Sequence, residues 1–195
     1  MEIEKATAYI LDKLGRELPK TLHYHSVDHV LDVLNVAEHI ATLEGVTGDD
    51  FILLKTAAMY HDSGFIVQGK DHEHFGCELV KKILPEFNYN GDQIKKICGM
   101  IIATRIPQMP CNLLEQILCD ADLDYIGRDD YWKISNYLFK EINESAQLLE
   151  IDWLKIQIEF LDQHHFFTAT AINERKEKKA IYIQKLKEIL IQKSI

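Results

Sequence analysis

Apolar residues recur at helical spacing along nearly the whole chain. From residue 3 to residue 14 they stand three or four positions apart, and Gly15 is expected to end that helix. A second helix is expected to begin near Ser26, a good N-cap residue, and to end before Gly45. The same periodicity predicts further helices over residues 49–62, 74–84, 92–104, 112–126, 129–143, 151–163 and 169–192. Alternating β-branched runs with turn signals are absent from the sequence, so the pattern predicts an all-α helical bundle.

Length and composition favour one globular domain. The 195 residues suffice for one hydrophobic core, and we expect a single domain over residues 1–195. Hydrophobic residues make up 47% and charged residues 27%, as in ordinary globular proteins. Only 4 prolines and 9 glycines occur, which argues against a loop-rich fold.

Charge and cysteine usage narrow the classes of partner and compartment. The net charge of −9 argues against a nucleic-acid polymer as partner, because phosphate-backbone affinity depends on Lys and Arg. The N-terminal stretch does not resemble a secretory signal, and no run of 18 apolar residues predicts a membrane span. The 4 cysteines are widely spaced and form no CxxC pair, which is typical of reduced thiols in a cytoplasmic protein.

Three polar features follow one another along the predicted helices. His29 lies in the second helix, and the dipeptide His61-Asp62 ends the apolar third helix. The segment LCDADLDYIG then carries three carboxylates: Asp120, Asp122 and Asp124. A lone helical histidine is more often a core or surface residue, and a single His-Asp pair occurs by chance. Together, however, these residues offer the mixed nitrogen and oxygen ligands of a divalent ion that activates water.

These motifs resemble the HD superfamily of metal-dependent phosphohydrolases, especially its small stand-alone bacterial members. TAAMYHDSG resembles the family's apolar helix with its adjacent His and Asp, and LCDADLDYIG resembles the segment of the last ligand. The resemblance covers about residues 22–127 and leaves 129–195 as a C-terminal helical extension. It implies a single HD domain with four metal ligands: His29, His61, Asp62 and Asp122. Asp122 is preferred because the family's ligand usually follows a small residue and precedes an apolar one, and Asp120 is kept as the alternative.

The stretch YHSVDH places His25 four residues before His29, so both side chains project from one helix face. It resembles the cyclic-nucleotide phosphodiesterase segment of the superfamily, where Tyr-His precedes the metal-binding histidine. That resemblance implies that His25 is a general acid for the leaving oxygen, a role that suits a pKa near working pH. The alternative is that His25 only orients a ligand or a water molecule.

A second metal ion is less well supported by the sequence. DHEHFG resembles the His-x-x-x-Gly segment of two-metal members such as the HD-GYP phosphodiesterases, which implies His72 as an additional ligand. Thr104 and Arg105 stand where those members carry paired histidines, so we expect one firmly bound ion and leave a second open. Arg105 is a candidate for binding a substrate phosphate, and its alternative role is to stabilise the end of its helix.

We therefore expect a metal-dependent phosphomonoesterase or phosphodiesterase that acts on a nucleotide or another small phosphorylated metabolite. Asp62 would also orient or deprotonate water, and Mn, Fe, Co, Ni, Zn or Mg would suit the ligands. One alternative is a catalytically inactive metal- or nucleotide-binding regulatory module, which the intact ligand set disfavours. Another is a di-iron oxygenase, which the missing histidines near Thr104 disfavour. The amphipathic C-terminal helix offers a surface for a homodimer.

Overall fold

The computed structural model describes residues 1–193, and every regular element in that range is helical, which confirms the all-α prediction. Residues 194 and 195, the end of the predicted domain, lie outside the described part. The α-helices are α1 (Ile3–Glu17), α2 (Val27–Leu43), α3 (Gly48–Tyr60), α4 (His72–Ile83), α5 (Gly91–Ala103), α6 (Leu113–Asp122), α7 (Tyr131–Ala146), α8 (Glu150–Gln163) and α9 (Ala169–Lys193). Three short 3₁₀ helices connect them: η1 (Ser63–Ile66), η2 (Leu84–Phe87) and η3 (Asp124–Gly127).

The helix ends follow local chemistry, with two corrections to the sequence-based boundaries. Ser26 caps α2 as expected, because its hydroxyl accepts a hydrogen bond from the backbone N–H of His29 at 3.3 Å. Gly15 was expected to end the first helix, but α1 continues through it to Glu17. The helix ends there because Pro19 disfavours a helical conformation at the residue before it. The helix expected over 112–126 was also too long, since α6 ends at Asp122 and η3 follows.

The helix α3 is the centre of the core. It packs against α1, α2, α5 and α6. Seven of its last eight positions are buried: Leu53, Leu54, Thr56, Ala57, Ala58, Met59 and Tyr60. Neighbours on every side explain why its sequence lacks a polar stripe. The polar dipeptide that follows, His61-Asp62, is therefore carried into the interior, where polar groups need partners.

A close approach between η1 and α4 closes one side of this region. A Cβ atom on Gly64 would lie only 1.8 Å from the carbonyl oxygen of His72, so only glycine allows the two backbones to meet. This contact holds the first turn of α4 against the residues that follow α3.

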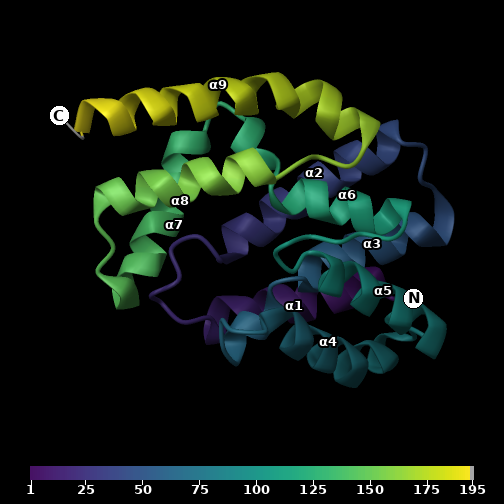
Figure 1. Ribbon diagram of the computed structural model, residues 1–195. Coiled ribbons are helices and arrows are strands. Elements are labelled where there is room, and N and C mark those ends of the chain that lie inside the picture. The colour runs from purple at the N-terminus through teal and green to yellow at the C-terminus, as the bar shows by residue number, and fades with distance from the viewer. Residues whose placement is uncertain (194–195) are drawn as a thin grey trace.

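The C-terminal helices form a second group that covers the motif-bearing helices. Figure 1 shows α7, α8 and α9 together on one side of the molecule, with α9 crossing above α8. The guanidinium of Arg175 in α9 donates to Asp124 at 2.6 Å, and a Cβ on Gly127 would lie 2.4 Å from Cβ of Arg175. Thus η3 and α9 are in tight contact. Among the described residues, no helix combines the length and the hydrophobicity that a bilayer span requires.

Candidate metal centre and the adjoining cavity

Four predicted ligand side chains converge where α2, the end of α3 and the end of α6 meet. Nε2 of His29, Nε2 of His61 and a carboxylate oxygen of Asp122 all lie within 4.8 Å of one another. His29 Nε2 is 3.2 Å from Asp122 Oδ1 and 3.4 Å from His61 Nε2. Oδ2 of Asp62 completes the group, at 3.4 Å from His29 Nε2 and 3.2 Å from His61 Nε2.

The chemistry of this group fits a divalent cation. The Nδ1–H of His61 donates to the carbonyl oxygen of Ala58 at 2.8 Å, which leaves Nε2 with a lone pair directed at the cluster. Oδ2 of Asp62 is buried and has no hydrogen-bond donor among the described residues. Buried carboxylate oxygens without donors are costly unless a cation is bound to them. Two imidazole nitrogens and two carboxylate oxygens are ligands that transition metals accept.

Both carboxylates of the cluster are held in the ionised form. Burial opposes ionisation of Asp62, but the neighbouring His61 outweighs it and lowers the pKa of Asp62 well below its usual range. Burial likewise opposes ionisation of Asp122, and the hydrogen bond from His29 outweighs it, so this pKa is also lowered. The site therefore presents two negative charges to a bound ion.

Asp122, and not its neighbour Asp120, lies in the cluster. Asp120 points to the segment before α9, where Oδ1 accepts from the N–H of Phe167 at 2.9 Å. Oδ2 accepts from the N–H of Thr168 at 2.8 Å and from its hydroxyl at 2.7 Å. Asp120 therefore anchors the start of α9, and both of its oxygens are hydrogen-bonded there. Burial raises the pKa of this carboxyl to about 6.

His25 precedes Ser26, the N-cap of α2, so the expectation that it shares a helix face with His29 was wrong. It still lies near His29, with ring centroids 6.1 Å apart, and it has a carboxylate partner that the sequence did not reveal. Its Nδ1 is hydrogen-bonded to Glu141 of α7, and the other oxygen of Glu141 accepts from the backbone N–H groups of Tyr24 (2.8 Å) and His25 (3.1 Å). Burial lowers the pKa of His25, but the bond to Glu141 and the charge of Asp62 outweigh it, so the pKa is raised above its ordinary value. No described residue is bonded to its Nε2.

The ring of Phe65 in η1 contacts the rings of two histidines. Its ring stacks on His25 at a centroid distance of 4.0 Å and on His72 at 4.1 Å. Nδ1 of His72 is 3.1 Å from the carbonyl oxygen of Gly69, while Nε2 lies 3.5 Å from Oδ1 of Asp62. Asp62 thus presents Oδ2 to the four-residue cluster and Oδ1 to His72. This places the predicted additional ligand next to the cluster, where a second ion would share Asp62.

Arg105 has carboxylate partners of its own. Its Nη2 donates to Asp71 at 2.8 Å, and its Nε lies 3.5 Å from Glu73, so it braces the first turn of α4. Thr104 and Ile106, on either side of Arg105, belong to the described lining of the cavity and Arg105 does not. The predicted phosphate contact would require the guanidinium to leave these partners.

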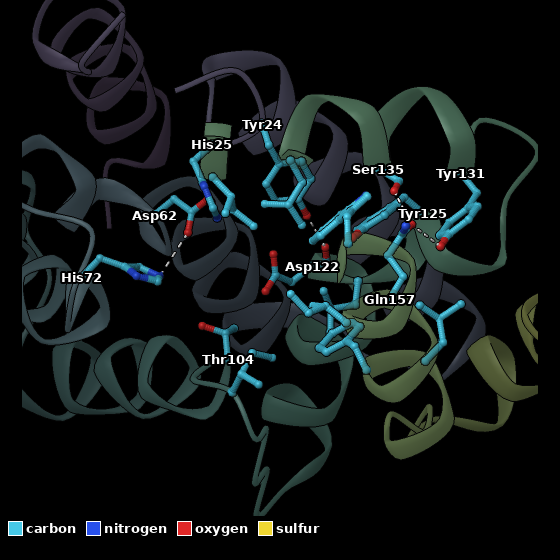
Figure 2. A pocket seen from close by; sticks show the side chains of 18 of the residues that line it. Tyr24, His25, Asp62, His72, Thr104, Asp122, Tyr125, Tyr131, Ser135 and Gln157 are labelled. Carbon is cyan, nitrogen blue, oxygen red and sulfur yellow. Dashed lines mark hydrogen bonds and ion pairs between the residues drawn. The ribbon is translucent and has the colours of Figure 1, made fainter. Parts of the chain in front are cut away.

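A cavity of about 260 Å³ opens beside the metal cluster. Asp62, Asp122, His25 and His72 line one end, and Ser135, Tyr131 and Gln157 line the other, as Figure 2 shows. The wall between them is apolar and comes largely from α7 and α8: Leu138, Ile142, Trp153, Ile156, Phe160 and Leu161.

Glu141 and Gln157 are the functional candidates that the sequence did not reveal. Both lie in amphipathic helices after residue 129, and neither belongs to a motif. Glu141 is one of two glutamates in the stretch EINE, and nothing in that stretch indicates that its carboxylate reaches a histidine 116 residues away. Only the packing of α7 against the loop before α2 identifies it.

The part of the chain that holds the cluster matches a known protein family. The model of the HD domain family matches residues 26–124, which include all four residues of the cluster. An uncharacterized protein of Clostridium beijerinckii is 34% identical over 84 residues, or 42% of this chain and 53% of that protein. The matched segment therefore spans about half the length of this curated relative.

Two crystal structures share the fold over nearly the full length. A predicted HD superfamily hydrolase from an uncultured Thermotogales bacterium matches with a TM-score of 0.63 and 20% identity, over 97% of this chain and 91% of that chain. A protein from Lactobacillus plantarum matches with a TM-score of 0.71 and 16% identity, over 100% of this chain and 99% of that chain. The similarity in fold thus includes the C-terminal helices.

Proposed function

The chain belongs to the HD domain family, and we propose that it is a metal-dependent phosphohydrolase that cleaves a phosphate ester of a small metabolite. The observation that carries this proposal is the convergence of two imidazoles and two carboxylates at one end of a cavity, with His25 beside them.

His29, His61, Asp62 and Asp122 would hold the cation. A divalent ion supplies Lewis-acid chemistry, since it polarises a phosphoryl oxygen and lowers the pKa of water. The chain itself offers little positive charge for a phosphate, because its net charge is −9 and no Lys or Arg is among the described residues that line the cavity. Asp62, ionised and buried, is positioned to orient the attacking water through Oδ1, the oxygen that faces His72.

His25 is assigned to proton delivery. Glu141 holds the proton on Nδ1 and stabilises the imidazolium, so Nε2–H is the group that can donate. As the oxygen of water bonds to phosphorus, the bond between phosphorus and the ester oxygen breaks, and that oxygen takes the proton from Nε2. The products are inorganic phosphate and an alcohol if the substrate is a monoester.

The test begins with chelator-treated protein to which Mn²⁺, Co²⁺, Zn²⁺ or Mg²⁺ is restored. We expect hydrolysis of phosphate esters only with added metal. Replacement His25→Gln should slow alkyl esters by about 10²–10⁴-fold, because an alkoxide needs a proton to leave. The same variant should slow p-nitrophenyl phosphate much less, since p-nitrophenolate leaves without one.

Two outcomes would contradict the proposal. Stoichiometric metal without turnover of any monoester or diester would indicate a regulatory binding module. Oxygen consumption by the Fe²⁺-loaded protein, again without ester hydrolysis, would indicate an oxygenase.

A further inference from the structure

We propose that the substrate is a single phosphoryl group esterified to a flat, uncharged ring system, and that Gln157 of α8 recognises a hydrogen-bond acceptor on that ring. This inference rests on the proposed ester hydrolysis and names the substrate class of the same site.

The size and lining of the cavity indicate the ring. Its volume is about 260 Å³, whereas an apolar cavity of about 150 Å³ is enough to bind benzene. Aromatic and aliphatic side chains of α7 and α8 form the wall, among them Leu138, Trp153 and Phe160. A flat ring with one substituent would fill this space and remove apolar surface from water.

The distribution of charge indicates one phosphoryl group. The acidic side chains that line the cavity, Asp62, Glu73 and Asp122, all lie toward the metal-cluster end. Among the described lining residues, none is a lysine or an arginine. A chain of several phosphates would bring negative charges into the apolar part without a cationic partner, and burying unpaired charge is strongly unfavourable. The phosphoryl group therefore belongs at the metal end and the neutral ring at the far end.

Gln157 supplies the polar contact at the far end. Its Oε1 accepts from the hydroxyl of Tyr131 at 2.8 Å and from the hydroxyl of Ser135 at 2.5 Å, and Figure 2 shows the amide between these two groups. These bonds fix the orientation of the amide, whose Nε2 has no acceptor among the described residues. Gln157 is only 6% exposed and lines the cavity, so a ring held at this end would meet the unbonded N–H group. A ring carbonyl or ring nitrogen would satisfy it, and a site built in this way rejects analogues that lack the acceptor.

Two probes separate recognition of the acceptor from chemistry at phosphorus. Benzyl phosphate and 4-acetylbenzyl phosphate have the same benzylic leaving oxygen, but only the second carries a carbonyl acceptor on the ring. We expect the wild-type protein to favour the acetyl ester by about fivefold to tenfold in kcat/KM, the size of one net hydrogen bond. In Gln157→Glu, an oxygen remains for Tyr131 and Ser135 but the N–H donors are lost, so the ratio should fall to about one. Gln157→Leu provides a second variant without a buried charge.

A nucleoside 5′-monophosphate is assayed alongside the two benzyl esters. Dependence on Gln157 with the nucleotide would identify a nucleobase as the ring. Dependence with the acetylbenzyl ester alone would identify a non-nucleotide aromatic ester, and either result supports the inference.

A binding measurement distinguishes failure of this inference from failure of the proposed function. Trp153 lines the cavity and is one of 2 tryptophans, so in a Trp132→Phe background its fluorescence reports ring binding without any turnover. Quenching by 4-acetylbenzyl alcohol that weakens in Gln157→Leu, with no hydrolysis of any ester, would support the ring site and overturn the phosphohydrolase. Metal-dependent hydrolysis with equal kcat/KM for both benzyl esters, in wild type and variants alike, would overturn the inference and leave the phosphohydrolase standing.

Discussion

His25 and Glu141 lie 116 residues apart in the sequence and share a buried hydrogen bond. Glu141 also accepts two backbone N–H groups, so its carboxylate is fixed before any substrate arrives. Burial opposes its ionisation, but the bond from His25 outweighs this and lowers the pKa of Glu141. This pairing of a lowered carboxyl pKa with a raised imidazole pKa is what suits His25 to donate a proton near neutral pH.

The pH profile tests the role of Glu141 as a positioning residue. Because His25 must be protonated to act, kcat for an alkyl ester should fall as pH rises through its pKa, which lies above the ordinary value near 6.5. Glu141→Gln removes the negative partner, so the alkaline limb of kcat should move to lower pH by about one unit. A limb that stays in place in this variant would show that another group controls it.

The sequence indicated some of these residues and not others, for a physical reason. The motifs that the sequence revealed contain the four residues of the cluster: His29, His61, Asp62 and Asp122. The residue types next to them are restricted by packing; in the HDSG stretch, for example, only glycine fits at position 64 against α4. Glu141 and Gln157 act through contacts made by helices that are distant in sequence. A helical glutamate with such a contact has the same periodicity as one that faces solvent.

At the scale of elements, the contact between η1 and α4 fixes where His72 lies relative to Asp62. Helical periodicity predicted the start of α4 to within two residues. It gives no information on the distance between the backbones of η1 and α4. The break between α6 and η3 was missed for a similar reason. The side chain of Asp122 lies in the cluster, whereas the side chain of Asp124 is bonded to Arg175 of α9. These two contacts accompany the change from α-helix to 3₁₀ helix, and helical periodicity in the sequence does not reveal it.

Replacement Gly64→Ala tests this contact. The added Cβ would lie 1.8 Å from a backbone oxygen, so η1 and α4 must separate, and we expect a loss of about 1–3 kcal/mol or more in unfolding free energy. Chemical denaturation measures it. Gly15→Ala is the matched control, because that glycine is exposed within α1 and a Cβ there meets nothing within 4 Å. The control should gain about 0.5–1 kcal/mol. Equal stability of the Gly64 variant and wild type would contradict the close approach.

At the scale of the whole molecule, the site has two parts with different origins in the chain. Residues 26–124, which the family model matches, supply the four side chains of the candidate metal cluster. The helices α7 and α8 lie beyond that range and supply Glu141 and most of the apolar wall. Their amphipathic pattern predicted helices that pack on a core, and the fold shows that part of their apolar face lines a cavity instead. On the proposed function, the cation would be held in the region that the family model matches. Proton delivery would join His25, just before that region, to Glu141 in α7, and α7 and α8 would recognise the organic group.

The most direct test of the central claim is the metal content of three proteins after dialysis against Mn²⁺: wild type, Asp122→Asn and Asp120→Asn. Each is assayed for phosphate ester hydrolysis in the same samples. We expect at least one tightly held ion per chain in wild type. Asp122→Asn should bind it at least about 10–100-fold more weakly, the loss seen even for residues that only support ligands, and should lose hydrolysis in parallel.

Asp120→Asn is the matched control, because it makes the same chemical change in the same helix only two residues away. Because Asp120 anchors the start of α9, this variant should lose about 1–3 kcal/mol of stability and keep its metal. Circular dichroism shows whether each variant is folded. Metal retained by Asp122→Asn, or a folded wild-type protein that binds no metal, would contradict the account.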